Sequence, residues 1–178
     1  MLIKKILCPI DRSDDAIIGT AYAISLAREH KAELVIFHVT QFPWRKMTRY
    51  CQPERTLGVE WRSQLTVEHI LGLAASRTEN FVQKNLAANL LGVPWTIRTS
   101  IGNVAREIVA AAVQEAADCV VMAKRKRAIL LRYCFPSVSE IVSARAPCPV
   151  LSLCPPQIEH FSSDPLRWTR QLGPIHQV

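Results

Sequence analysis

The stretch Cys119-Val120-Val121-Met122-Ala123 is apolar at every position. A strand with one face in water usually alternates apolar and polar side chains, whereas a parallel strand that is covered on both faces is apolar throughout. Four further short runs have the length and composition of strands, namely Lys5–Ile10, Glu33–Val39, Trp95–Ile101 and Val150–Cys154. The sequence therefore predicts five strands in a mostly parallel sheet.

Helical patterns fill the intervals between these runs. The first expected helix runs from a cap at Ser13 or Asp14 to His30, and the second runs from about Ser63 to Leu91, where Gly92 and Pro94 end it. The third begins after the cap Asn103. The fourth begins at the capping box of Ser137 and Glu140 and ends at Pro147. This alternation predicts an α/β fold: an open, doubly wound, Rossmann-like sheet of order 3-2-1-4-5 with helices on both faces.

In such sheets ligands bind outside the carboxyl ends of the strands, where the strand order reverses. Here that switch point lies between the first and fourth strands. The segments expected at this place are Pro9–Ser13, Val39–Thr40 and Met122–Ser139.

Length and composition suit one globular domain with an appended segment. The 178 residues are 49% hydrophobic and 21% charged, with a net charge of +7. We expect a domain over residues 1–154, with a variable loop at 41–62, and a proline-containing tail at 155–178 that is poorly ordered. No apolar run reaches the roughly 18 residues of a membrane-spanning helix, and no targeting segment is recognised. The expected location is the cytoplasm, with no membrane contact.

The cysteines favour neither a metal site nor disulfides. Six are present, and none forms a Cys-x-x-Cys pair. Four lie in apolar stretches, where a reduced cysteine behaves as a small hydrophobic residue; they are Cys8, Cys119, Cys148 and Cys154. We therefore expect buried thiols and no bound metal.

Several of these segments, in this order and spacing, resemble the universal stress protein family. The segments are Ile6 to Ser13, Phe37-His38-Val39, Ile101-Gly102-Asn103, Cys119 to Met122, Ser137 to Val142, and Ala146 to Leu151. The resemblance spans residues 3–154 and implies the same doubly wound sheet, of the adenine nucleotide alpha hydrolase-like kind. It also implies a homodimer that pairs through the last strand, here Val150, Leu151, Ser152, Leu153 and Cys154.

The resemblance implies one of two subtypes. One binds ATP through a glycine loop, and the other lacks that loop. The three glycine positions of that loop fall on Ala123, Lys126 and Pro136, and only Ser137 fits the motif. Glycines let backbone N–H groups approach phosphate oxygens, whereas proline has no N–H to donate. We therefore expect the subtype that does not bind ATP, with no cofactor, although an adenine nucleotide is not excluded.

Three interpretations of the basic loop that follows the fourth strand stay open. In the first, Lys124–Arg127 is a solvated surface on a protein that acts by contacts with unknown protein partners. In the second, Lys124, Lys126, Arg127 or Arg132 holds an anion in place of the glycines. Asp11 and Val39 then stand at the positions that the family uses for adenine and ribose. The full candidate set for this altered or vestigial nucleotide site is Ile10, Asp11, Val39, Met122, Ala123, Lys124, Lys126, Arg127, Ser137, Val138 and Ser139.

The third interpretation is binding to nucleic acid or to anionic lipid. Arginines and aromatic residues such as Trp44, Tyr50 and Trp61 are interleaved in 42–62. No nucleic-acid-binding motif accompanies them, so this interpretation is the least favoured of the three.

Nothing in the sequence indicates an enzyme. It contains no Gly-x-Ser-x-Gly, His-Glu-x-x-His or phosphate-binding Walker motif. His38 lies inside a strand and is expected to be a core histidine with its hydrogen bonds satisfied. Asp11 is expected to cap the first helix or to contact a ligand, and no catalytic residue is assigned.

Overall fold

The computed structural model describes residues 2–41, 67–124 and 136–154. Five strands form one sheet of order β3-β2-β1-β4-β5 in which every pair is parallel. The strands are β1 (Lys5–Pro9), β2 (Glu33–Thr40), β3 (Trp95–Ile101), β4 (Cys119–Ala123) and β5 (Val150–Leu153). The predicted order is confirmed, and each predicted strand differs from the observed one by no more than one residue at its end.

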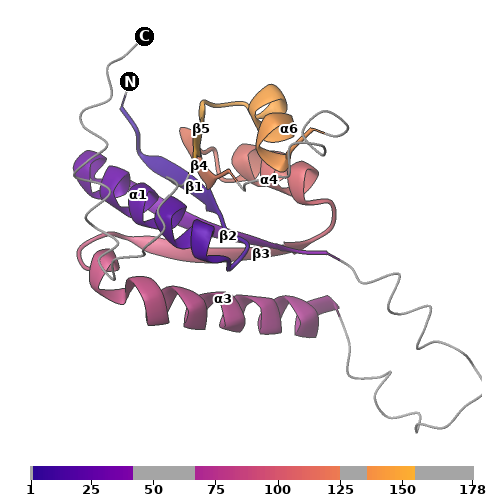
Figure 1. The fold of residues 1–178 in the computed structure, drawn as a ribbon, viewed down its shortest axis with the longest axis horizontal. Coiled ribbons are helices and arrows are strands. Elements are labelled where there is room, and N and C mark those ends of the chain that lie inside the picture. Colours follow the sequence, from indigo (N-terminus) through magenta and orange to yellow (C-terminus); the bar gives the residue numbers. More distant parts are fainter. Residues whose placement is uncertain (1, 42–66, 125–135, 155–178) are drawn as a thin grey trace, which may run out of the picture.

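Helices cover both faces of the sheet, as predicted (Figure 1). The helices α1 (Asp14–His30) and α3 (Val67–Leu90) lie on one face, and α4 (Val104–Gln114) and α6 (Val138–Arg145) lie on the other. The expected start of α3 near residue 63 lies outside the described residues.

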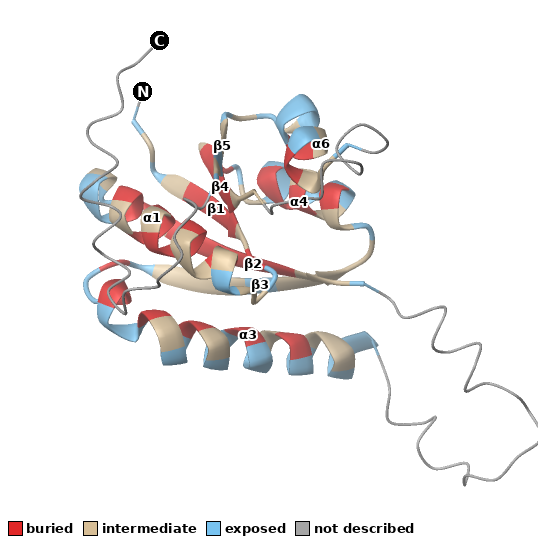
Figure 2. Ribbon diagram, in the orientation of Figure 1, coloured by how far each residue is buried: buried red, intermediate tan, exposed pale blue. Residues whose placement is uncertain are grey.

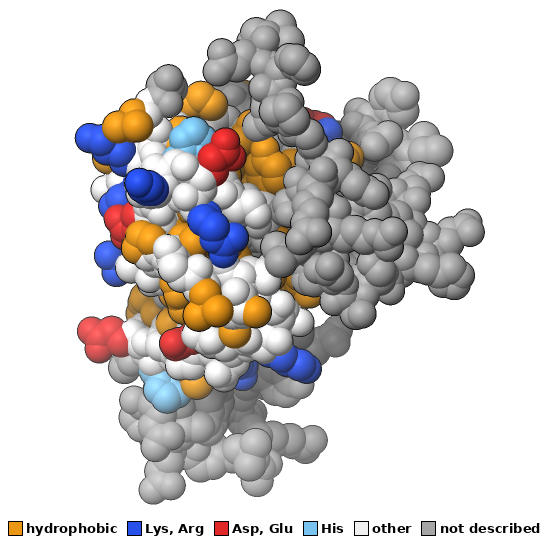
Figure 3. All heavy atoms as spheres, turned by 90° about the vertical axis from the view of Figure 1, so that its left-hand side faces the viewer, with side chains coloured by type: hydrophobic (Ala, Val, Ile, Leu, Met, Phe, Trp, Pro, Cys, Tyr) orange, Lys and Arg blue, Asp and Glu red, His pale blue; other side chains and the backbone are white. Residues whose placement is uncertain are grey.

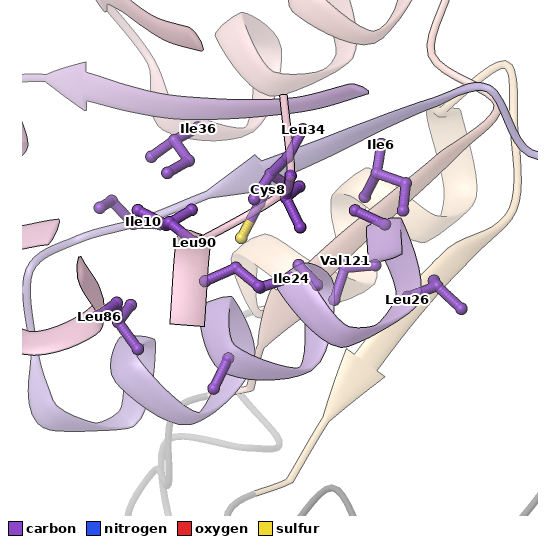
Figure 4. Close-up of a cluster of buried hydrophobic side chains, with 14 of the residues drawn as sticks. Ile6, Cys8, Ile10, Ile24, Leu26, Leu34, Ile36, Leu86, Leu90 and Val121 are labelled. Atoms are coloured by element: carbon purple, nitrogen blue, oxygen red, sulfur yellow. The ribbon is translucent and has the colours of Figure 1, made fainter. Parts of the chain in front are cut away.

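The central strand divides two hydrophobic cores. Along β1, Ile6 and Cys8 face α1 and α3, whereas Leu7 faces α4 and α6, because successive side chains of a strand point to opposite faces. Figure 4 shows Ile6, Cys8 and Ile24 in the first of these cores, together with Leu86 and Leu90 of α3. Burial follows the same arrangement, with the inner strands buried and the outer side of α3 exposed (Figure 2).

Local sequence signals placed three helix ends correctly. The Asn103 side chain accepts a hydrogen bond from the Arg106 N–H at 3.2 Å and so caps α4. The capping box of Ser137 and Glu140 is present at α6. Gly92, with φ of 77°, follows α3 in the left-handed conformation that favours glycine.

Two expectations about side chains were correct only in part. Ser13 is the N-cap residue of α1, but its side chain makes no capping hydrogen bond. Cys8 and Cys119 are buried as expected, whereas Cys148 is half-buried and Cys154 is exposed. Both of these cysteines lie beside β5, which is the edge strand and has a neighbour on one side only in the described sheet.

Charge is balanced over the described part of the chain. It contains eleven Lys or Arg and eleven Asp or Glu, so its net charge with neutral histidines is zero. Figure 3 views the side of the molecule on which the N-terminus lies, and side chains of both signs are scattered over its described surface. The excess positive charge therefore belongs to segments 42–66 and 125–135, which the structure does not describe.

None of the helices in the described ranges is long and apolar enough to cross a membrane. Within the same ranges, no three His, Cys, Asp or Glu residues are grouped so that they could hold a metal ion. The tail at 155–178 and the loop at 42–62 lie outside the described residues, so the expectations about them stay predictions.

Candidate functional site

A cleft of about 710 Å³ opens at the carboxyl ends of β1, β2 and β4. This is the switch point that the predicted strand order indicates, because the chain leaves β1 toward one face and β4 toward the other. Six elements contribute to its walls: the turn after β1, the first turn of α1, the end of β2, the end of β4, one side of α4 and the amino end of α6.

The turn after β1 is braced by Asp11. One carboxylate oxygen, Oδ1, accepts hydrogen bonds from the Ser13 backbone N–H at 3.0 Å and from the Ser13 hydroxyl at 2.5 Å. Between them, Arg12 takes the left-handed conformation with φ of 62°. That conformation costs a non-glycine residue about 1–2 kcal/mol, so the Asp11 bonds offset part of this strain. Asp11 thus organises the turn that leads into α1.

His38 of β2 lies in the wall of the cleft and is only 6% exposed. Its Nδ1 is 2.8 Å from the Ile10 carbonyl oxygen. A carbonyl oxygen can only accept, so Nδ1 carries the proton and Nε2 of the neutral ring is an acceptor. Burial lowers the pKa of His38 from its ordinary value, and the Ile10 bond opposes this only in part. The neutral ring is therefore the form present at neutral pH.

The amino end of α6 is occupied by its own capping box. The Ser137 N–H donates to Glu140 Oε2 at 2.8 Å, and the Glu140 N–H donates to the Ser137 hydroxyl at 3.2 Å. Lys124 Nζ donates to the other oxygen, Glu140 Oε1, at 3.3 Å. The hydrogen bonds from Ser137 and Lys124 hold the pKa of Glu140 below its ordinary value. A carboxylate therefore already lies at the helix end, where a bound anion would otherwise be favoured.

The end of β4 is packed tightly against α1. A Cβ atom added to Gly19 would lie 3.0 Å from the Ala123 backbone nitrogen and 3.1 Å from the Ala123 Cβ. The glycine in the middle of α1 thus lets the helix approach Ala123, which is the first of the three glycine positions in the family loop. Ala123 also lines the cleft.

Eight of the eleven candidate residues from the sequence meet at this cleft, one does not, and two lie outside the described residues. Lining it are Ile10, Asp11, Val39, Met122, Ala123, Ser137, Val138 and Ser139. Lys124 does not line it, because its backbone N–H bonds to the Leu153 carbonyl at 2.7 Å and its side chain is held by Glu140. Lys126 and Arg127 lie outside the described residues, as does Arg132.

The candidate set omitted His38 and several residues of the surrounding helices. Asp15 and Ala16 of α1, together with Val104 and Ile108 of α4, line the cleft. Both helices begin near the carboxyl ends of strands, so their first turns could have been included on topology alone. The role of His38 could not have been found in this way, because it depends on the contact with Ile10.

Comparison with known proteins gives a consistent result. The family model described as "Universal stress protein family" matches residues 2–153. No curated protein sequence matches the chain.

Several solved structures are similar. The hypothetical protein MJ0577 has a TM-score of 0.64 and 23% identity, over 89% of this chain and 100% of that chain. Universal stress protein UspA from Lactobacillus plantarum has a TM-score of 0.60 and 20% identity, over 86% of this chain and 99% of that one. A universal stress protein in complex with cAMP has a TM-score of 0.57 and 18% identity, over 86% and 98%. At these identities the structures show a shared fold.

Proposed function

Because this chain belongs to the universal stress protein family, we propose that it is a stress-response member that does not bind ATP tightly. It acts by forming a dimer and contacting other proteins, and no catalytic residue is assigned to it. The occupied amino end of α6 is the observation that carries this proposal.

Three features of the described cleft act against a triphosphate. Pro136 has no N–H to donate, and the Ser137 and Glu140 N–H groups already bond within the capping box. Glu140 adds a negative charge at the same place. Ala123 has a Cβ where the family loop has glycine, and this Cβ lies against Gly19.

Calorimetry with Mg-ATP tests the proposal. We expect no binding stronger than the millimolar range, about −4 kcal/mol. Glu140→Gln is the informative variant, because Gln also forms a capping box but carries no charge. A gain in ATP affinity in this variant would support repulsion by Glu140, whereas micromolar affinity in the unaltered protein would refute the proposal. Mass spectrometry of the natively purified protein would reveal a nucleotide that co-purifies.

Dimer formation is proposed through β5. The Pro149 carbonyl oxygen accepts from the Val120 N–H of β4 at 2.9 Å, and the Leu153 carbonyl oxygen accepts from the N–H of Lys124, directly after β4, at 2.7 Å. Backbone groups alternate in direction along a strand, so those of Val150 and Ser152 point away from β4 toward the open edge. Such an edge can pair with the same strand of a second copy, as the family resemblance also implies.

A second candidate function is contact with a polyanion. It is favoured by the charge distribution, because the entire excess of seven positive charges lies in 42–66 and 125–135. These segments directly follow Gln41 and Lys124, and so continue from the two strand ends beside the cleft. Retention on heparin that falls steeply with salt would support this function, whereas elution at low salt would refute it.

A further inference from the structure

Two cysteines lie at the two ends of the open edge strand. Cys148 precedes β5 and is half-buried, and Cys154 follows β5 and is exposed. Both thiols are free, and β5 has no neighbour on its outer side in the described sheet. The other two cysteines of the described residues, Cys8 and Cys119, are buried. Cys148 and Cys154 are therefore the described thiols that a second molecule at this edge can reach.

These two cysteines cannot bond to each other within one chain. They are six positions apart in the sequence, with the strand β5 between them. An extended chain rises about 3.3 Å per residue, so the two Cα atoms are roughly 20 Å apart. A disulfide needs its Cα atoms within about 7 Å of each other. A bond between Cys148 and Cys154 must therefore join two copies of the chain.

The backbone of β5 limits the registers in which a second copy can pair with it. Val150 and Ser152 direct their N–H and carbonyl groups away from β4, and in an antiparallel two-fold pair such outward groups must face one another. When Val150 lies opposite Ser152 of the second copy, the whole segment from Cys148 to Cys154 pairs with itself around Leu151. A shift in either direction pairs one end of this segment with residues outside it. The centred register therefore uses the open edge most completely.

The centred register places Cys148 directly opposite Cys154 of the second copy, at both ends of the interface. Opposed residues in a hydrogen-bonded antiparallel pair have Cα atoms about 5.5 Å apart, which is within the usual range for a disulfide. The side chains also share a face. Cys148 and Val150 pack on the side of α4 and α6, and alternation along the strand puts Cys154 on that side too. A two-fold axis perpendicular to the sheet keeps this face the same in both copies.

We propose that oxidation by a peroxide links Cys148 to Cys154 of a second copy, so that two symmetric disulfides lock the β5 dimer. The inference rests on the dimer of the proposed function, and it adds the chemical condition under which that dimer becomes covalent. Because Cys154 is exposed, it is the thiol that the oxidant reaches first. A small thiol can reduce the bond again by exchange, so the lock is reversible.

The reaction proceeds in two steps. The Cys154 thiolate attacks one oxygen of hydrogen peroxide, the O–O bond breaks, and hydroxide leaves, so that Cys154 becomes a sulfenic acid. The Cys148 sulfur of the second copy then attacks the Cys154 sulfur, the S–O bond breaks, and the oxygen leaves as water. For each disulfide, two thiols lose two electrons and two protons, and one peroxide is reduced to two waters.

Two serine variants of the full chain test the pairing by complementation. Both carry Cys51→Ser and Cys134→Ser, because these two cysteines lie outside the described residues. One variant adds Cys148→Ser and the other adds Cys154→Ser, so neither can form the proposed bond alone. After treatment with hydrogen peroxide, an equal mixture should give at least about tenfold more covalent dimer on a non-reducing gel than either variant does. The reason is that pairing at the edge raises the effective thiol concentration to the order of millimolar.

Peptide mass spectrometry of the oxidised parent chain should identify Cys148 linked to Cys154, and dithiothreitol should remove the link. As much covalent dimer from either serine variant alone as from the mixture, or none from the mixture, would overturn the inference. Light scattering of the reduced protein separates this inference from the proposed function. A non-covalent dimer that forms no link between Cys148 and Cys154 refutes the disulfide alone, whereas a monomer that also forms no link refutes the dimer itself.

Discussion

Replacing Gly19 by alanine is expected to destabilise the protein, although the same change normally stabilises a helix. Gly19 is in the interior of α1, where glycine costs about 1 kcal/mol relative to alanine. The added Cβ would lie 3.0 Å from the backbone nitrogen of Ala123. A backbone atom of a strand that is paired in the sheet cannot move aside as a flexible side chain could, so the helix must shift.

The expected magnitude follows from these two opposing effects. Overpacking of this kind costs about 1–3 kcal/mol, and the helix preference for alanine returns about 1 kcal/mol. The net loss in the free energy of unfolding is then about 0–2 kcal/mol. Gly72 is the matched control, because it lies inside α3 and nothing comes within 4 Å of a Cβ added there. Gly72→Ala should gain about 0.5–1 kcal/mol.

Urea denaturation of the two variants at one protein concentration measures the difference. We expect the Gly19→Ala variant to be about 0.5–3 kcal/mol less stable than the Gly72→Ala variant. At about 2–4 °C per kcal/mol for a chain of this size, thermal melting should separate them clearly. Adding Ala123→Gly to Gly19→Ala removes the opposing Cβ and should recover part of the loss. If Gly19→Ala stabilises the protein as much as Gly72→Ala does, the tight contact between α1 and β4 is wrong.

Three further predictions concern a thiol, a carboxylate and the sheet edge. Burial raises the pKa of the Cys8 thiol to about 12. A thiol reagent should therefore label exposed Cys154 in the native protein, but Cys8 only after unfolding. Peptide mass spectrometry can verify which cysteine is labelled. The Lys4 and Lys5 N–H groups bond to Asp118 at 2.7 and 2.9 Å and lower its pKa. Asp118→Asn should therefore destabilise the protein above about pH 5. The difference should shrink as pH falls below about 4 and through the lowered pKa of the folded chain, below which the carboxylate is protonated in both folded and unfolded chains. A pH-independent difference in urea midpoints would contradict this. Ser152→Pro removes an N–H group from the open edge of β5 and should yield a monomer, as measured by light scattering. The control Ser152→Ala should leave the dimer intact. A dimer in both variants would place the interface elsewhere.

The fold could be predicted because its signals are local or follow from topology. The strand runs and the caps at Asn103 and Ser137 depend on residues within a few positions of each other. Given five strands and their helices, right-handed crossovers leave few arrangements, and the observed order is the predicted one. The position of the cleft followed from that order.

The contacts that give the cleft its chemistry could not be predicted, because they join residues distant in sequence. His38 bonds to Ile10, 28 residues away, and Gly19 lies against Ala123. His38 was expected to be a satisfied core residue; this is correct for Nδ1, whereas Nε2 has no hydrogen-bond partner among the described residues. Glycine within the helical pattern of α1 was a signal for a close approach, although the sequence does not identify the partner.

The loss of the glycines and the occupation of α6 by Glu140 are separate obstacles to phosphate binding. Substitution of glycine at 123, 126 and 136 limits how closely the backbone can approach an oxygen, and it does not by itself reverse the sign of the local charge. The capping box does change the local charge, because it places a carboxylate at the helix end. It also uses two N–H groups. Glu140 is in turn held by Lys124, the first cation of the basic run after β4. Lys124 therefore pairs with the protein's own carboxylate, and it is not available to replace the missing glycines as an anion ligand.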